Sequence, residues 1–324
     1  MNLKGFEFRH IMVLDALFTE CHVGRAAKIL NLSQPAVSNA LGWLRQHFDD
    51  PLLVRVGNAL KLTPFAEDLR VPVRELVIAF RMTARARPHF DPREAEGKIR
   101  ILMSHYEATL LLPEILKRIA HEAPNIEIDC LGINSDTNQF LRGEVDLLIL
   151  NRDILHEEHG KESLFHDRLV CVGCAQAGWP DIMDRETYLA AKHIAPKMPD
   201  TKMPTSLNVI SAIDTALNKA GIHRNIPATV PYQLIMELIR GTPLLATLPS
   251  ALVNHSSTSG LRIFETPFDL GRIITGQQWH ASAHNDARSK WLRQIVRDVV
   301  SDLHLPTEYC DTPEGSNPST LGTD

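Results

Sequence analysis

The 324-residue sequence predicts an α/β protein with a helical and winged N-terminal domain. Three observations support this prediction: two short helix patterns and a hairpin within 24–63, an apolar repeat at helical spacing over 64–87, and alternating strand and helix patterns from residue 98 onwards. We therefore expect a winged helical domain over 1–64, a linking helix over 65–90 and an α/β domain over 91–305. Residues 306–324 are rich in Pro, Ser, Thr and Gly without periodicity, and we expect a disordered tail there.

The first helix of the predicted pair runs over 23–30. Its small residues Ala26 and Ala27 share a face with Leu30, and small side chains allow a second helix to approach closely. Asn31 follows, and asparagine readily adopts the left-handed conformation that ends a helix and turns the chain.

The second helix runs over about 34–48. Ser33 stands where an N-cap belongs, and Pro35 lies in the first turn, where its missing N–H has no helical partner to lose. Apolar residues at spacings of 4, 3 and 4 predict its buried stripe, which consists of Val37, Leu41, Leu44 and Phe48.

The opposite face of this helix is polar and carries Gln34, Ser38, Asn39, Gly42 and Arg45. Gln and Asn side chains pair with adenine in the major groove, and hydroxyls or a helix N-terminus bind phosphate. The pattern therefore indicates a helix-turn-helix that reads DNA. An ordinary helix pair with a polar outer face is the alternative interpretation.

Residues 52–62 predict a short hairpin that turns at Gly57 and Asn58, with Arg55 projecting as a phosphate contact on the wing. The cap, the turn, the apolar stripes and this wing all favour the DNA-binding interpretation. The residues predicted to contact DNA are Arg25, Ser33, Gln34, Pro35, Ser38, Asn39, Arg45, Arg55 and Thr63.

The apolar repeat over 64–87 predicts a long helix that Pro72 kinks or weakens. Its stripe is longer than a winged domain needs, so it can pair with its copy in a second chain, although packing on its own domain is the alternative. The stripe consists of Phe65, Leu69, Val73, Leu76 and Phe80.

The remainder alternates between strands and helices, which is the layout of an α/β domain. Strand patterns occupy 98–103, 126–131, 146–150, 168–174, 228–230, 244–248, 261–265 and 272–278. Helix patterns occupy 110–123, 138–143, 207–220, 232–240, 249–255 and 286–303.

The net charge of −5 conceals an asymmetry along the chain. Residues 1–90 contain 12 Lys or Arg and 8 Asp or Glu, whereas residues 91–324 contain 22 Lys or Arg and 31 Asp or Glu. A mildly basic head on an acidic body suits a DNA reader with a separate sensing domain, and a dimer would double its phosphate contacts. No apolar run approaches the roughly 18 residues of a membrane span and 1–9 do not resemble a signal peptide, so we expect a cytoplasmic protein.

Nothing in the sequence indicates an enzyme, a cofactor or a metal, because the common nucleotide-binding, protease and hydrolase motifs are absent. Cys171 and Cys174 lie in a predicted strand that points them to opposite faces, so we interpret the pair as structural. His156 and His159 flank two glutamates in a loop, and we interpret that cluster as solvated.

The motif residues resemble those of LysR-type transcriptional regulators, and the likeness extends to about residue 305. The branch that it resembles contains nodulation regulators that sense flavonoids and regulators of naphthalene and salicylate breakdown. Arg45, where many members have Glu, fits that branch, while Phe65 replaces a residue that is often basic in the family. The similar segments are Ala26-Ala27, SQPAVS at 33–38, QPAVSNALGWLR at 34–45, DPLLVR at 50–55, LTPFA at 62–66, HDRLVCVGC at 166–174, LATLP at 245–249 and Trp279-His280.

The resemblance implies a two-lobed effector domain similar to periplasmic binding proteins, with 272–278 and the last helix returning to the first lobe. It also implies a dimerising linker helix over 65–90, a homodimer or homotetramer, contact with RNA polymerase and a small, hydroxylated aromatic inducer between the lobes.

Ligands in open α/β sheets bind beyond the carboxyl ends of strands. Tyr106 and Tyr232 are expected to stack on an aromatic ring there, and His105, Asn151 or Thr247 to bond its hydroxyls. Helix capping and core polarity are the alternative roles for each residue. The predicted ligand-binding residues are Ser104, His105, Tyr106, Asp136, Asn151, Pro231, Tyr232 and Thr247.

The sequence therefore predicts a cytoplasmic transcription factor that binds double-stranded DNA and an aromatic inducer and controls aromatic metabolism. Two alternatives stay open at this point. One is a regulator whose sensor domain binds no inducer, and the other is a small-molecule binding protein or enzyme with a vestigial helix-turn-helix head.

Overall fold

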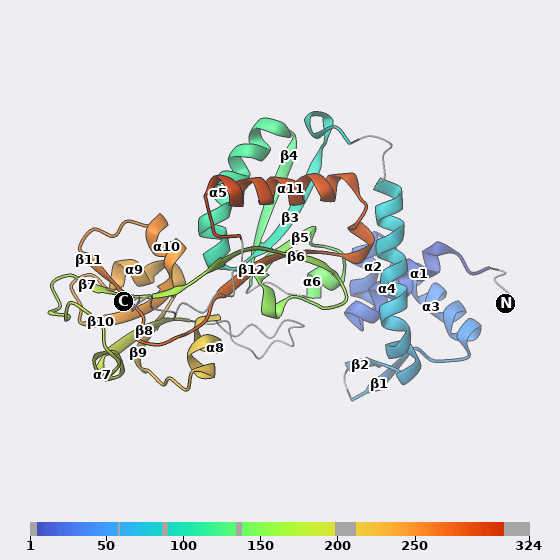
Figure 1. Ribbon diagram of the computed structural model, residues 1–324. Coiled ribbons are helices and arrows are strands. Elements are labelled where there is room, and N and C mark those ends of the chain that lie inside the picture. Colours follow the sequence, from blue (N-terminus) through green and yellow to red (C-terminus); the bar gives the residue numbers. More distant parts are fainter. Residues whose placement is uncertain (1–4, 58, 86–89, 134–137, 198–211, 308–324) are drawn as a thin grey trace, which may run out of the picture. The chain divides into compact units, whose positions relative to one another are not determined.

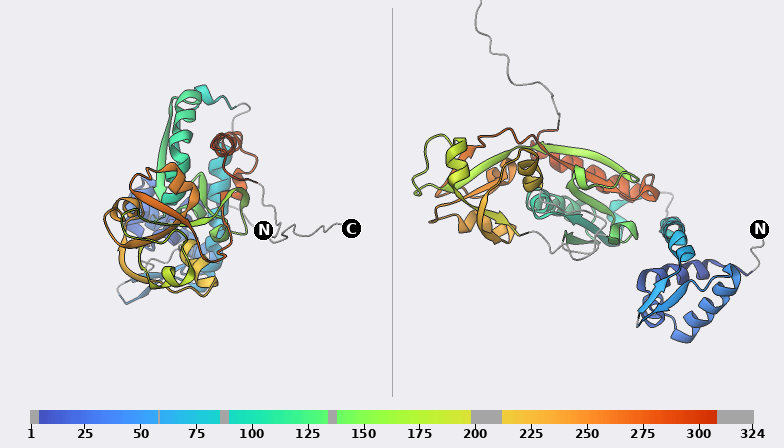
Figure 2. Two further views of the ribbon diagram at one scale, coloured as in Figure 1. Left: turned by 60° about the vertical axis from the view of Figure 1, so that its left-hand side comes forward. Right: turned by 90° about the horizontal axis from the view of Figure 1, so that it is seen from below.

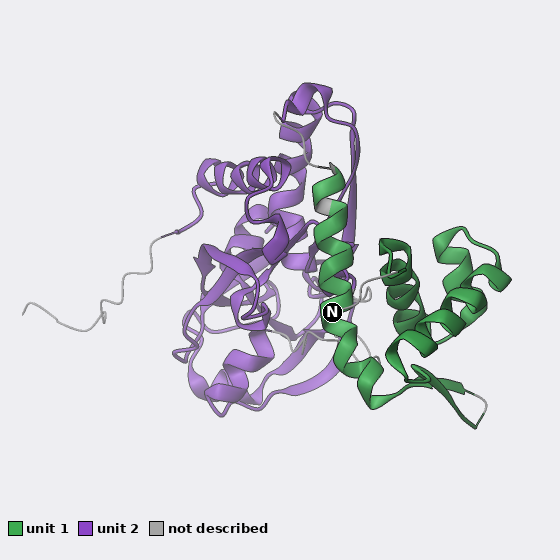
Figure 3. Cartoon of the chain, turned by 90° about the vertical axis from the view of Figure 1, so that its right-hand side faces the viewer, with its two compact units in different colours: residues 1–89 green, residues 90–324 purple. Residues whose placement is uncertain are grey.

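The computed structural model describes residues 5–57, 59–85, 90–133, 138–197 and 212–307. It divides the chain into two compact units, residues 1–89 and 90–324 (Figure 3). No helix in these described ranges is both long and apolar enough to cross a membrane.

The first unit is a helical domain with a two-stranded wing (Figure 1). Its elements are α1 (Phe8–Glu20), α2 (Val23–Leu30), α3 (Gln34–Phe48), β1 (Leu53–Val56), β2 (Ala59–Leu62) and α4 (Pro64–Arg85). The predicted pair of helices is confirmed, and so is the antiparallel hairpin. The sequence patterns did not reveal α1, which buries Val13, Leu14 and Leu17 in the same core as the stripe of α3.

Local capping fixes the junction between α2 and α3 as predicted. Asn31 adopts a left-handed conformation with φ of 52°, and its N–H donates back to the last turn of α2. The Ser33 hydroxyl accepts a hydrogen bond of 3.3 Å from the Ala36 N–H. Val37, Leu41 and Leu44 are buried, so the polar face of α3 must point away from the core.

The apolar stripe of α4 divides between two environments. Ala66 and Val73 are buried in the core of this unit, whereas Leu76 and Phe80 remain 52% and 49% exposed. Pro72 lies inside α4, and the helix continues past it. The helix therefore packs on its own domain and still presents apolar side chains outwards.

The second unit contains two five-stranded sheets, each with its own helices (Figures 1 and 2). The first lobe has the strand order β4-β3-β5-β12-β6, in which β4, β3 and β5 are parallel and β12 is antiparallel to both of its neighbours. Its strands are β3 (Gly97–Met103), β4 (Ile126–Gly132), β5 (Leu147–Asn151), β6 (Gly160–Asp167) and β12 (Ile273–Trp279).

Helices cover this first sheet. The long helices α5 (His105–Glu122) and α11 (Ala287–Asp302) pack together over one face and share a core with Ile101 of β3 and Ile149 of β5. Phe140 of the short helix α6 (Asn138–Leu141) belongs to a different core, together with Leu102 and Leu148. Short 3-10 helices lie at Pro92–Glu94, Arg152–Ile154 and Ala281–Ala283.

The second lobe has the strand order β11-β7-β10-β8-β9. Its strands are β7 (Leu169–Cys174), β8 (Lys192–Pro196), β9 (Asn225–Val230), β10 (Leu244–Pro249) and β11 (Leu261–Glu265). Its helices are α7 (Arg185–Ala190), α8 (Ala212–Lys219), α9 (Ile235–Leu238) and α10 (Ser250–His255), with a 3-10 helix at Tyr232–Leu234. Cys171 and Cys174 are free and buried in the two different cores on either side of β7, as their structural interpretation predicts.

The chain crosses between the lobes twice, once between β6 and β7 and again between β11 and β12. The return of β12 to the first sheet confirms the implied two-lobed arrangement. The sequence patterns missed β6, β8 and α7, and they started α5 five residues late, since α5 begins at His105. Part of the predicted helix 207–220 and nearly all of the predicted tail lie outside the described residues.

Candidate functional site

The polar face of α3 is a continuous exposed surface at the start of the helix. Ser33, Gln34, Pro35, Ser38 and Asn39 are all exposed, although the Ser33 hydroxyl is engaged as the N-cap. Two amide side chains and a hydroxyl thus project from the first turns of a helix whose opposite side is buried. This geometry is the one that a recognition helix needs to enter a major groove.

Two exposed arginines accompany this helix. The Arg25 Nε donates to Glu20 Oε2 at 2.7 Å, an ion pair on the surface of the preceding helices. Arg55 is exposed on β1, and its Nε donates to the Gly57 carbonyl at 3.3 Å across the turn of the wing. Both guanidinium groups are therefore exposed, and their phosphate contacts stay a prediction.

Arg45 and Thr63 have internal roles instead. The Arg45 guanidinium donates to the carbonyls of Pro51 at 2.8 Å and Leu53 at 3.1 Å, which ties the end of α3 to the start of the wing. Thr63 is only 6% exposed; its hydroxyl donates to Asp50 at 2.7 Å and accepts from the Ala66 N–H at 3.1 Å. The predicted DNA contact of Thr63 is therefore wrong, because its side chain caps α4 inside the domain.

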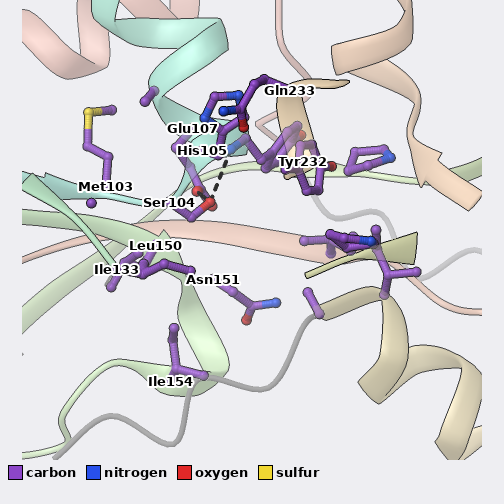
Figure 4. Close-up of a pocket in the computed structure, with 18 of the residues that line it drawn as sticks. Met103, Ser104, His105, Glu107, Ile133, Leu150, Asn151, Ile154, Tyr232 and Gln233 are labelled. Carbon is purple, nitrogen blue, oxygen red and sulfur yellow. Dashed lines mark hydrogen bonds between the residues drawn. The ribbon is translucent and has the colours of Figure 1, made fainter. Parts of the chain in front are cut away.

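The second unit contains a cavity of about 1070 Å³ whose wall includes residues of both lobes (Figure 4). The first lobe contributes the residues that follow β3 and β5, and the second lobe contributes the ends of β8 and β9 together with the 3-10 helix. Of the predicted ligand-binding residues, six line this cavity: Ser104, His105, Tyr106, Asn151, Pro231 and Tyr232.

The structure corrects one of the predicted ligand contacts. Thr247 is 1% exposed and lies inside the second lobe, where its hydroxyl is 2.7 Å from the Tyr188 hydroxyl. Tyr106 lines the cavity and its hydroxyl donates to Asp167 at 2.6 Å, so the stacking of its ring on a ligand stays a prediction. Asp136 lies outside the described residues.

Tyr232 is the aromatic residue that connects the two lobes. Its side chain packs against the core of the first lobe and against both cores of the second. Its ring centroid lies 5.7 Å from that of His105. The Tyr232 hydroxyl is buried and has no hydrogen-bond partner in the described part of the chain, so a polar atom at the cavity wall is left for a ligand to satisfy.

Glu107 is a site residue that the sequence patterns did not single out. It lines the cavity yet is only 2% exposed, and burial raises the pKa of its carboxyl from 4.5 to about 7. The Ser104 hydroxyl donates to Glu107 Oε2, and the Thr275 hydroxyl lies 3.4 Å from Oε1. The Ser-x-x-Glu spacing, which is typical of a capping box, was the available signal.

The loop that contains His156 and His159 is packed against other rings and is not the solvated cluster that the sequence indicated. The rings of His156, His159 and His280 surround Phe140, with a centroid distance of 4.5 Å between His159 and His280. Burial lowers the pKa of all three imidazoles, that of His280 to about 4. Among the described residues, no group of His, Cys, Asp or Glu side chains is arranged to hold a metal ion.

Two family models match the chain, one for each unit. Residues 8–67 match the bacterial regulatory helix-turn-helix protein of the lysR family. Residues 92–301 match the LysR substrate binding domain.

Characterised relatives and solved structures agree with these matches. Nodulation protein D 1 of Neorhizobium galegae is 34% identical over 312 residues, which cover 95% of this chain and 99% of the relative. Nodulation protein D 1 of Rhizobium tropici is 34% identical over 313 residues, which also cover 95% of this chain and 99% of the relative. A probable transcriptional regulator from Pseudomonas aeruginosa superposes with a TM-score of 0.58 at 26% identity, covering 94% of this chain and 99% of that one. Full-length OxyR from the same organism has a TM-score of 0.65 at 15% identity, covering 91% and 97%, and therefore shares the fold.

The Glu107 carboxyl should make stability depend on pH. Because its pKa is raised in the folded state, the unfolded chain ionises first, and stability falls as pH rises from 4.5 to about 7. Glu107→Gln removes this dependence, so the variant should gain up to about 3 kcal/mol over wild type across that window. Denaturant unfolding at pH 4.5 and at about pH 7 measures the difference in the free energy of unfolding between variant and wild type. Glu114→Gln, which changes a partly exposed residue of the same helix, should show no such pH-dependent gain.

Proposed function

The chain belongs to the LysR family of transcriptional regulators, and from that premise we propose that it controls a promoter for aromatic-compound metabolism in response to a small hydroxylated aromatic. The family consists of regulators that bind DNA and small-molecule inducers and that oligomerise, and it is not a family of enzymes. The observation that carries the proposal is the pairing of an exposed recognition-helix face in one unit with a large cavity between lobes in the other. We place the protein in the cytoplasm, where it would meet its operator and RNA polymerase.

The DNA contacts follow from the first turns of α3. Gln34 and Asn39 are exposed amides that can read base edges, and Ser38 can bond either a base or a phosphate. Arg55 on the wing supplies a phosphate contact that is independent of sequence. In this assignment α3 determines which DNA sequence is bound, whereas the wing and Arg25 contribute affinity for DNA of any sequence.

Dimerisation through α4 is the second part of the proposal. Phe65, Pro72, Leu76 and Phe80 are exposed and recur at spacings of 7, 4 and 4 along one side of the helix, beside the buried Val73. Burying such a strip against its copy would remove apolar surface from water and would join two helix-turn-helix domains. Two linked recognition helices read half-sites about 34 Å apart or a multiple of that distance.

The inducer would bind in the cavity between the lobes. Its volume of about 1070 Å³ is at the upper end of the roughly 300–1,000 Å³ that small-molecule sites occupy. Tyr232 and His105 offer aromatic faces, and Asn151, Ser104 and Gln233 offer hydrogen-bonding groups for ring hydroxyls. A ligand that contacts both lobes would favour one arrangement of them and so alter the bend of the bound DNA.

Two substitutions separate base reading from phosphate binding. Gln34→Ala should relax base preference at one operator position by about 1–3 kcal/mol of discrimination. Arg55→Ala should instead weaken binding to all duplexes alike and reduce the salt slope by about one unit. Binding titrations against operator variants at several salt concentrations measure both effects, with Gln46→Ala on the same helix as a control. Unchanged specificity in Gln34→Ala would mean that a different face of α3 meets the bases.

A charge on the α4 strip should separate the protomers. Leu76→Glu places a carboxylate in the proposed apolar interface, so the dimer should weaken at least about tenfold, which is about 1.4 kcal/mol. Analytical ultracentrifugation of the full chain checks this, with the neighbouring exposed Glu75→Ala as the matched control. A Leu76→Glu protein that associates as strongly as wild type would exclude this strip as the interface.

A further inference from the structure

Glu107 is an acid in the cavity wall that has no cation paired with it among the described residues. It is almost fully buried in the first turn of α5, and its hydrogen-bond partners include the neutral hydroxyls of Ser104 and Thr275. No lysine, arginine or histidine of the described ranges forms an ion pair with it. An acid buried in this way is stabilised only by neutral hydrogen bonds.

The groups around Glu107 add no positive charge. Tyr106, which also lines the cavity, donates its hydroxyl to Asp167 at 2.6 Å. Burial, and after it the charges of Glu107 and Asp167, raise the pKa of the Tyr232 phenol. Burial lowers the pKa of His105, which favours its neutral imidazole. This part of the cavity wall therefore offers the Glu107 carboxyl, the Tyr232 phenol and an uncharged imidazole.

Lys197 is the one lysine or arginine among the described residues that line the cavity, and it follows β8 in the second lobe. Lys197 is exposed, so its ammonium keeps its hydration, and within the described ranges no ion pair joins it to Glu107. It cannot neutralise the buried acid from the solvent without losing that hydration.

Uncharged hydroxylated aromatics and aromatic carboxylates would interact differently with this wall. An uncharged ring hydroxyl can donate to a Glu107 oxygen and accept from the Tyr232 hydroxyl, which satisfies the buried phenol. A ring carboxylate would have to lose its hydration beside an acid. If Glu107 is ionised the two charges repel, and if it is protonated the ligand carboxylate still lacks a cation.

We propose that Glu107 is a specificity-determining residue that admits uncharged hydroxylated aromatics to the cavity and excludes aromatic carboxylates. This inference rests on the proposed function, because it takes the cavity as the inducer site. It narrows the inducer from any small aromatic to one without an acidic group at the buried end. The selectivity is assigned to the buried Glu107 carboxyl, whose hydrogen-bond partners include the hydroxyls of Ser104 and Thr275.

A matched ligand pair tests the exclusion. We would titrate the full-length protein near neutral pH with 2-naphthol, which is uncharged, and with 2-naphthoate, which has the same rings and a carboxylate. Wild type should bind 2-naphthol at least about tenfold more tightly. Glu107→Gln should shrink that ratio to about threefold or less by tightening the binding of 2-naphthoate. Glu114→Gln, on the same helix with its side chain paired to Lys117, should retain the wild-type ratio.

Each contrary result has a distinct meaning. Wild type that binds 2-naphthoate as tightly as 2-naphthol overturns the exclusion, whether or not the variant folds, and leaves the inducer cavity in place. An unchanged ratio in folded Glu107→Gln moves the selectivity to another residue and also overturns the proposal. Failure of wild type to bind either compound overturns the inference together with the proposed aromatic inducer, while the DNA-binding assignment stands on its own test.

Discussion

The Asp167 carboxylate, at the first crossing between the two sheets, is the interaction on which the ligand cavity depends. It accepts the Tyr106 hydroxyl at 2.6 Å from the first lobe and the Ala251 N–H at 2.9 Å from the second, and the Arg168 N–H at 2.7 Å fixes its other oxygen. This buried acid therefore holds the start of α5 against the start of α10. Because Ser104, His105 and Glu107 occupy that same turn of α5, the joint also fixes one wall of the cavity.

In both units, a packed core holds polar side chains in fixed positions at a surface. In the first unit, the buried stripe of α3 and the ties from Arg45 to Pro51 and Leu53 hold a polar helix face outwards. In the second unit, packed cores hold Tyr232 at a cavity wall, where its hydroxyl has no hydrogen-bond partner among the described residues, and hold the Glu107 carboxyl there with neutral partners. Rigid surroundings thus keep hydrogen-bonding groups available, for base edges in one case and for an inducer in the other.

The sequence predicted best what is decided locally. Asn31, Ser33 and Pro35 act on their own helix ends, so the capped helix pair could be read without any tertiary information. Thr63 and Thr247 are polar residues that the sequence alone assigns to a surface. In the fold both are buried, and their hydroxyls form hydrogen bonds with Asp50 and Tyr188 respectively. Glu107 was missed for the converse reason, because a glutamate at helical spacing normally faces water, whereas tertiary packing buries this one. Strand β8 and helix α7 were missed because their short, mixed sequences carry no clear period.

The most direct test of a ligand-responsive DNA reader is the electrophoretic mobility of the full-length protein on its own upstream DNA. The complex would be run at two salt concentrations, with and without a panel of uncharged hydroxylated aromatics. A specific complex whose mobility changes with at least one compound is the predicted result, because the cavity and the recognition helix would then act in one molecule. A complex that is indifferent to every compound would contradict the sensing role, and the absence of any specific complex would contradict the regulator itself.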